Sequence, residues 1–162
     1  MTAAAAASPS PSPVAAAGRY LTFRLDGDEF GLPILQVREL LGRMPMTRLP
    51  GASANVLGVA NLRGKVLTIT DLRGLMGLPR AQASEYDVVV VLDVKGARNG
   101  SVGVLVDEVL DVVSVSDAQL EAPPAEARGP ERVMLRGVAR LERRLVLLID
   151  PSESLGLESA HV

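Results

Sequence analysis

The stretch GVANLRGKVLTITDLRGLMGL, residues Gly58 to Leu78, recurs without a gap further along the chain. The second copy is GVARLERRLVLLIDPSESLGL, residues Gly137 to Leu157, and it starts 79 residues later (137 minus 58). Seven of the 21 aligned positions are identical, including the Gly-Val-Ala opening and the Gly-Leu ending. Chance similarity between two short hairpin units is the alternative. A duplicated β unit explains the spacing and the shared ends better.

Short β segments separated by turn residues continue outward from this repeat. A weaker echo sets Leu25 to Leu40 beside Leu92 to Val112, with a longer turn in the second copy. An Asp-Gly turn at Asp26 and Gly27 predicts an opening hairpin. The expected strands are Tyr20–Leu25, Glu29–Ile34, Val37–Leu41, Gly58–Leu62, Val66–Thr70, Asp87–Val94, Ser101–Val106, Leu110–Val115, Val133–Leu141 and Leu145–Ile149.

Helices are expected to be short and few. One is predicted over Ser53–Leu57, one over Asp71–Met76 and one over Asp150–Leu155. The last two begin at an aspartate, whose carboxylate accepts hydrogen bonds from the free amides of a first helical turn, so both aspartates are interpreted as caps. The segment Glu121–Glu131 contains three prolines and mixed charge, which predicts a mobile loop between strands.

Each repeat unit is too small to bury much core on its own, so the two units should pack against each other. We expect each to form a bent antiparallel sheet that closes toward a barrel, because closure hides the sheet edges. The fold class is therefore all-β. The seam between the units is the natural place for a partner to lie.

The composition excludes several function classes. Hydrophobic residues make up 48% of the chain while aromatic residues make up 2%, so Val, Leu and Ile must form the core, which favours strands. No cysteine is present, which removes disulfides and thiolate chemistry and fits a reducing compartment. The formal charge of -2 argues against a nucleic-acid partner. No stretch approaches the roughly 20 apolar residues of a membrane span.

The residues needed for common catalytic chemistry are missing. The only histidine, His161, lies at the C-terminal end, so we expect neither a histidine base nor a metal site, and no cofactor. The acidic pair Asp107-Glu108 and the acidic turn from Asp26 to Glu29 are interpreted as solvated charges. An enzyme that uses Asp, Lys or Ser on a β-barrel stays a remote alternative.

The two copies differ where their side chains should be exposed. If Leu62 and Leu141 face their cores, alternation sends Arg63 and Glu142 outward. Arg63 is then free for a role that the second copy lacks, with Glu39 as the nearest candidate to pair with it. A single exposed ion pair adds little stability, so a binding partner is the stronger reason for both residues.

The segment GVANLRGKVLTITDLR (Gly58 to Arg73) resembles the signature of CheW-type coupling domains. Three further blocks are similar to the family pattern and fall in the same order: Tyr20–Leu40, Gly103–Leu120 and Arg136–Leu155. The resemblance implies two pseudo-symmetric five-stranded SH3-like barrels that share a hydrophobic core. It divides the chain into an Ala/Pro/Ser tail (1–18), expected to be disordered, a domain over 19–157 and a frayed end (158–162). The barrels would cover roughly 19–80 and 85–157, with strand exchange possible.

The resemblance also implies a function. It predicts a cytoplasmic, non-catalytic adaptor, recruited to membrane receptor arrays, that binds the regulatory domain of a CheA-type histidine kinase and the cytoplasmic tip of chemoreceptors (methyl-accepting chemotaxis proteins). By motif, the partner-binding residues are Val37, Glu39, Gly58 and Arg63, with Val104, Leu105 and Val106 near a groove. The alternative is a coupling paralogue that binds only kinase or only receptor and acts as a competitor or insulator.

Overall fold

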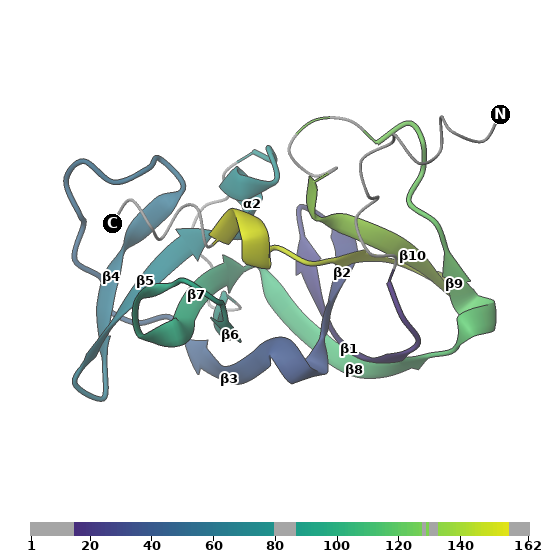
Figure 1. Ribbon diagram of the computed structural model, residues 1–162, viewed down its shortest axis with the longest axis horizontal. Helices are drawn as coiled ribbons and strands as arrows, with labels where there is room; N and C mark the ends of the chain where they lie inside the picture. The colour runs from purple at the N-terminus through teal and green to yellow at the C-terminus, as the bar shows by residue number, and fades with distance from the viewer. Residues whose placement is uncertain (1–14, 80–86, 128, 130–132, 156–162) are drawn as a thin grey trace, which may run out of the picture.

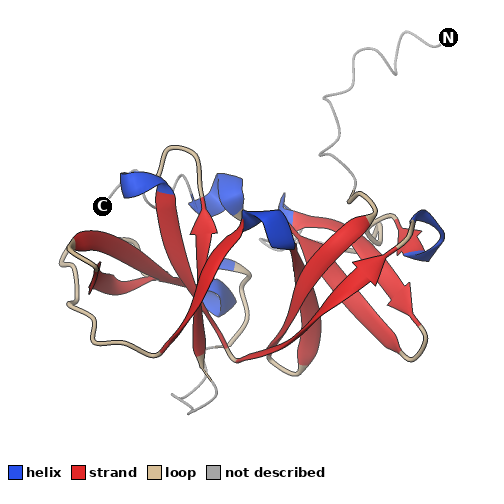
Figure 2. Cartoon of the chain, turned by 90° about the horizontal axis from the view of Figure 1, so that it is seen from below, coloured by secondary structure: helices blue, strands red, loops and turns tan. Residues whose placement is uncertain are grey.

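The computed structural model describes residues 15–79, 87–127, 129 and 133–155, and it contains two β-sheets that lie side by side (Figure 1). Strands dominate both halves of the molecule, and the helical segments are short pieces between them (Figure 2). This confirms the all-β class. Residues 1–14 of the expected tail and the end at 158–162 lie outside the described residues.

The first sheet has six strands in the order β8-β1-β2-β11-β10-β9, and the second has five in the order β3-β6-β7-β5-β4. The strands of the first sheet are β1 (Gly18–Leu25), β2 (Asp28–Pro33), β8 (Glu108–Val115), β9 (Leu120–Glu121), β10 (Leu135–Leu141) and β11 (Arg144–Ile149). Those of the second sheet are β3 (Val37–Gly42), β4 (Val56–Leu62), β5 (Lys65–Asp71), β6 (Val88–Asp93) and β7 (Ser101–Val106). Each sheet therefore combines strands from both halves of the chain.

The order and direction of pairing are the same in both sheets. In each, an antiparallel hairpin joins a second hairpin through one parallel pair, β2 with β11 in the first sheet and β7 with β5 in the second. The repeated segment forms β4 and β5 in one copy and β10 and β11 in the other, as the sequence repeat predicts. The extra strand β9 is two residues long, and its counterpart is the single bridge between Thr47 and Val59. The expected pseudo-symmetry is thus present, with a short sixth strand added to one sheet.

Three groups of buried apolar side chains hold the sheets together. The largest group lies between the sheets and takes residues from both, for example Phe23 and Leu32 from the first and Val90 and Val104 from the second. Two smaller groups fill the inner faces of the separate sheets; one contains Tyr20, Val115, Ala139, Val146 and Leu148, and the other Ala60, Leu67, Ile69, Val89 and Val91. The predicted shared hydrophobic core is present.

The short helical segments agree with the sequence prediction except at one place. The carboxylate of Asp71 accepts from the backbone N–H of Arg73 (3.1 Å) and caps α2 (Leu72–Leu75). Asp150 accepts from the N–H of Ser152 (3.1 Å) in the same way before the helix at 152–155. The other segments are 3-10 turns: η1 (Ile34–Gln36), η2 (Arg98–Gly100) and η3 (Asp117–Gln119).

The helix predicted over Ser53–Leu57 is wrong. The N–H of Val56 donates to the carbonyl of Ser53 (3.0 Å) in a tight turn, and β4 then begins at Val56. The carbonyl of Asn55 accepts from the N–H of Asp71 (2.8 Å), which draws this segment into the sheet. Five residues make too few helical hydrogen bonds to compete with strand pairing.

The interpretation of the acidic residues as solvated charges is wrong for Asp107 and Glu29. Asp26 and Asp28 are exposed, and the side chain of Glu108 is 42% exposed. Asp107 lies where the chain passes from β7 of the second sheet to β8 of the first, and its carboxylate binds Arg73 of α2 and the backbone N–H of Asp26. Glu29 forms an ion pair with Arg144 across the parallel strands β2 and β11. Alternation along single strands could not reveal these contacts, because the partners come from other elements.

The central core contains two buried hydroxyls without a hydrogen bond. Among the described residues, the Oγ1 atoms of Thr68 and Thr70 on β5 lack a partner, whereas the repeat places Leu147 and Ile149 at these positions. A buried hydroxyl that makes no bond destabilises the folded state. Thr70→Val should therefore raise the free energy of unfolding by about 1 kcal/mol, measured by urea unfolding.

Thr22→Val is the matched control for this prediction. Thr22 is also fully buried, but its hydroxyl contacts Asp111 and Arg144. The valine should lower stability there, because it removes bonds that are made. Equal effects of the two substitutions would contradict the interpretation.

Candidate partner-binding site

Glu39 and Arg63 form an ion pair that links the two opposite edges of the five-stranded sheet. Glu39 lies on β3 and Arg63 in the turn between β4 and β5, and the guanidinium donates from Nη1 to Oε1 (3.2 Å) and from Nη2 to Oε2. The Arg63 hydrogen bond holds the pKa of the Glu39 carboxyl below its usual value, so the pair stays charged at neutral pH. The side chain of Arg63 is 69% exposed. The structure thus brings together the two residues singled out from the copy contrast.

The backbone of the β4–β5 turn directs Arg63 outward. Arg63 and Gly64 both have positive φ, 50° and 85°, and the side-chain oxygen of Asn61 accepts from the N–H of Gly64 (2.8 Å). A non-glycine residue in this conformation is uncommon. In the second copy neither Glu142 nor Arg143 has a positive φ. The copies therefore differ in turn geometry as well as in side chains.

A hollow of about 330 Å³ lies beside the ion pair. Arg38 closes one side, since its guanidinium pairs with Asp93 (2.9 Å) and donates to the hydroxyl of Ser101 (2.7 Å). Glu39, Arg63, Lys65 and Asn99 complete the polar lining. Within the described part of the chain Lys65 has no ion pair. The hollow can hold an acidic or amide side chain of a partner. Sequence reasoning missed Arg38, although it is the neighbour of Glu39.

Val37 and Gly58 lie outside this hollow. Val37 is half-buried and packs against the central core. A Cβ atom built on Gly58 would lie 2.5 Å from the carbonyl oxygen of Thr47, so the main role visible for this glycine is a close approach of two backbone segments. Of the four motif residues, Glu39 and Arg63 form an ion pair beside the hollow, while Val37 and Gly58 support the fold.

The predicted groove strand is mostly core. Val104 and Val106 are fully buried between the sheets, and Leu105 is half-buried against the inner core of the five-stranded sheet. Exposed apolar side chains occur nearby on the sheet edges: Leu40 on β3 is 45% exposed and Val112 on β8 is 41% exposed. Leu40 pairs with the core residue Val90, and Val112 pairs with the core residue Leu21, so both extend the central core to its rim.

The described residues contain no group of three or more His, Cys, Asp or Glu side chains that could hold a metal ion. None of the helices in that part of the chain is long and apolar enough to cross a bilayer.

Comparisons with known proteins agree with this architecture. Residues 19–158 match the family model for the CheW-like domain. The chemotaxis protein CheW of Rhizobium meliloti is 40% identical over 130 residues, which cover 80% of this chain and 82% of that protein. CheW of Bacillus subtilis is 29% identical over 88% of this chain and 90% of its own length. The crystal structure of the scaffolding protein TtCheW from Thermoanaerobacter tengcongensis superposes with a TM-score of 0.75 at 23% identity, covering 83% of this chain and 89% of that one.

Proposed function

The chain belongs to the CheW-like domain family, and from that premise we propose that it links the regulatory domain of a CheA-type histidine kinase to the cytoplasmic tip of chemoreceptors. It is a non-catalytic coupling adaptor of chemotaxis signalling. The family in general couples chemoreceptors to CheA. We further propose that this chain works in the cytoplasm and is recruited to receptor arrays at the membrane.

The Glu39–Arg63 pair supports the kinase contact. The pair is exposed, is held in a fixed geometry by the turn at Gly64, and lies beside a hollow that offers the further cations Arg38 and Lys65. An exposed pair contributes little to folding, so its fixed orientation is better explained by recognition. Polar residues of this kind set the register of an interface and exclude wrong partners.

The apolar rim of the central core supports the receptor contact. Leu40 and Val112 keep more than two fifths of their surface in solvent although their strand neighbours are buried. A receptor helix could lay its apolar face on such a rim, which is helix-in-groove recognition. Val37, half-buried on the same sheet edge, would extend the contact area.

Holding both partners at once would let two modest interfaces act together. Binding of the first partner raises the effective concentration of the second, so the complex is tighter than either contact alone. A change in the receptor that alters its fit to the adaptor can then shift the equilibrium between kinase states. The adaptor would act through assembly.

Arg63→Glu should weaken binding to the kinase regulatory domain by about tenfold or more. The substitution places two carboxylates side by side and removes the guanidinium that the kinase would contact. Titration of the purified chain with the kinase domain measures this. Glu121→Ala is the control, since Glu121 forms a solvent-exposed ion pair with Arg140 on the other sheet. If Arg63→Glu and Glu39→Ala bind like the control, the proposed site is wrong.

The competitor alternative is separated by testing each partner alone. Pull-downs of the full chain with the kinase domain and, separately, with a receptor cytoplasmic fragment should both succeed. Binding of only one partner would favour the competitor or insulator role.

A further inference from the structure

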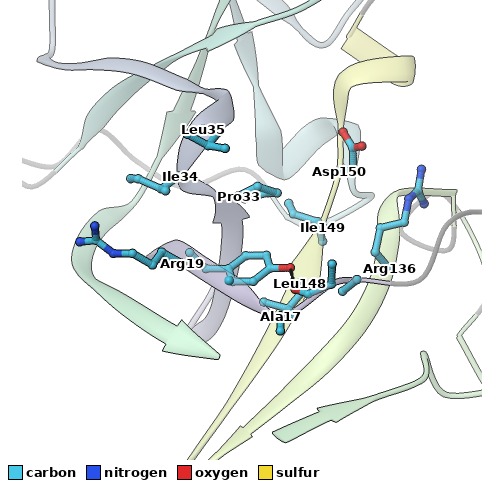
Figure 3. Close-up of a pocket in the computed structure, with 13 residues that line it drawn as sticks. Ala17, Arg19, Pro33, Ile34, Leu35, Arg136, Leu148, Ile149 and Asp150 are labelled. Carbon is cyan, nitrogen blue, oxygen red and sulfur yellow. Dashed lines mark hydrogen bonds between the residues drawn. The ribbon is translucent and has the colours of Figure 1, made fainter. Parts of the chain in front are cut away.

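A second and larger hollow, the end pocket, lies at one end of the six-stranded sheet and is separate from the Glu39–Arg63 site (Figure 3). It encloses about 500 Å³, within the range of pockets that hold a side chain or small ligand. Its apolar lining comes from the ring of Tyr20 and from Ile34, Leu148 and Ile149. Leu35 lies at the rim and is 92% exposed, more than any other large apolar side chain of the described residues.

In the five-stranded sheet, the first glycine of the repeat, Gly58, has neighbours from the segment before β4. There the Cβ of Met46 lies 3.4 Å from the position that a Cβ on Gly58 would take, and Met44 and Met46 pack against the inner core. In the six-stranded sheet the repeat equivalent of Gly58 is Gly137, and the residue beside it is Ala15, whose Cβ lies 3.2 Å from the same kind of position. The counterpart of Met46 in the six-stranded sheet is Leu120, because Thr47 and Glu121 pair with the equivalent residues Val59 and Val138. Ala15 lies beside Gly137 in addition, and its small side chain does not fill the end pocket that it lines.

A short flank of this chain forms one wall of the end pocket. The N–H of Ala15 donates to the carbonyl of Arg136 (3.0 Å), and the hydroxyl of Tyr20 donates to the carbonyl of Ala16 (2.6 Å). These two bonds hold residues 15–17 beside the pocket without placing a large side chain in it. The end pocket therefore stays open with residues 15–17 held in place.

Two arginines flank the end pocket at opposite ends of its apolar floor (Figure 3). Arg19 and Arg136 have no ion pair within the described residues, and Arg136 donates to the carbonyl of Val133 (2.6 Å). Most other described arginines pair with a carboxylate, among them Arg24, Arg38, Arg63, Arg73, Arg140 and Arg144. The carboxylate of Asp150, which also lines the pocket, is engaged by Ser152. Two guanidinium groups and one carboxylate line the pocket, so the net charge at the rim is positive.

We propose that the end pocket binds an acidic segment of another protein, which inserts one methionine or leucine side chain between Arg19 and Arg136. The apolar volume between Tyr20, Leu148 and Ile149 takes that side chain. The two arginines select carboxylates on either side of it. The site shares no residue with the hollow at Glu39 and Arg63, so it would allow a third partner to bind while the kinase contact is made.

The test uses the isotope-labelled full chain and the synthetic peptide acetyl-Glu-Glu-Met-Glu-Glu-amide, followed by NMR titration. Chemical-shift changes should concentrate at Tyr20, Leu35 and Ile149. The same peptide with alanine in place of methionine should bind at least tenfold more weakly, because it leaves the apolar volume unfilled. The peptide with lysines in place of the glutamates should not bind.

Three variants complete the test. Arg136→Glu and Arg19→Glu should each weaken binding of the methionine peptide by about fivefold to tenfold. Arg48→Glu should leave this binding unchanged, because Arg48 is another exposed arginine without a described ion pair and lies outside the end pocket. Ala15→Met should fill the pocket from within, raise the Tm and abolish peptide binding. Equal binding of the methionine and alanine peptides, equal effects of Arg136→Glu and Arg48→Glu, or concentration-dependent self-association at the same residues would overturn the proposal.

Discussion

Asp107→Ala should lower the free energy of unfolding by about 2–3 kcal/mol, a large effect for one surface-proximal carboxylate. Asp107 joins three elements at the crossover between the sheets. Its Oδ1 accepts from Nε of Arg73 (2.8 Å), and its Oδ2 accepts from the N–H of Asp26 (2.8 Å) and from Nη2 of Arg73. Its own N–H donates to the carbonyl of Arg24 (3.1 Å). Urea unfolding of the variant measures the loss.

The cost follows from the surroundings of Arg73. Its side chain is only 12% exposed, and the hydrogen bond to Asp107 raises its pKa, so the guanidinium stays charged. Without Asp107, the anions near it among the described residues are Asp26, at 3.5 Å, and Asp71, and it still donates to the carbonyl of Pro79. A partly buried cation that loses its main anion is strongly destabilising.

Two further variants make the test specific. Glu108→Ala removes the neighbouring carboxylate, which pairs with Arg24 while both side chains are about two fifths exposed, and it should change stability by less than about 0.5 kcal/mol. A double-mutant cycle of Asp107→Ala with Arg73→Ala should show coupling of about 1–2 kcal/mol. Equal losses in the free energy of unfolding for Asp107→Ala and Glu108→Ala would show that the Asp107–Arg73 contact stabilises the fold no more than an exposed ion pair does.

Gly58→Ala should lower the free energy of unfolding by about 3 kcal/mol, because the added methyl would lie 2.5 Å from the carbonyl oxygen of Thr47. That oxygen belongs to backbone held on both sides by the Thr47–Val59 bridge, with N···O distances of 2.8 Å in each direction, so it cannot move aside without breaking the bridge. Thermal and urea unfolding measure the effect.

Gly42→Ala is the control for a glycine in a strand of the same sheet. A Cβ on Gly42 would meet nothing within 4 Å, so this substitution should be neutral or slightly stabilising. A small effect of Gly58→Ala, similar to that of Gly42→Ala, would refute the steric account. If the account holds, any loss of partner binding in a Gly58 variant must be compared with its loss of folded protein before it is assigned to an interface.

The two copies show how the surfaces of a pseudo-symmetric scaffold can differ. Leu62 and Leu141 keep the same half-buried position against their inner cores. The next residues diverge: Arg63 turns outward with positive φ and binds Glu39, while Glu142 does not. In the other sheet, residues 15–17 line the end pocket. Each sheet thus has a surface feature of its own.

Most of the secondary structure could be predicted because it depends on residues that are close together in the sequence. Strand alternation, the Asp-Gly turn at Asp26 and the caps at Asp71 and Asp150 act within a few residues, and all are present. The helix at Ser53–Leu57 failed because pairing of Asn55 with Asp71, which lies 16 residues further along the chain (71 minus 55), overrode a weak local preference. The Glu39–Arg63 contact could be proposed from the contrast between copies, but its bidentate geometry could not.

The sequence by itself determined the class of elements, the duplication and the family, because these are written in periodicity and in residues compared position by position. Only the tertiary structure decided which strands share a sheet, that Asp107 binds Arg73 across 34 residues, and that an apolar pocket lies beside Tyr20. These contacts form when distant segments close on each other, and their energy depends on side-chain distances that no local pattern encodes.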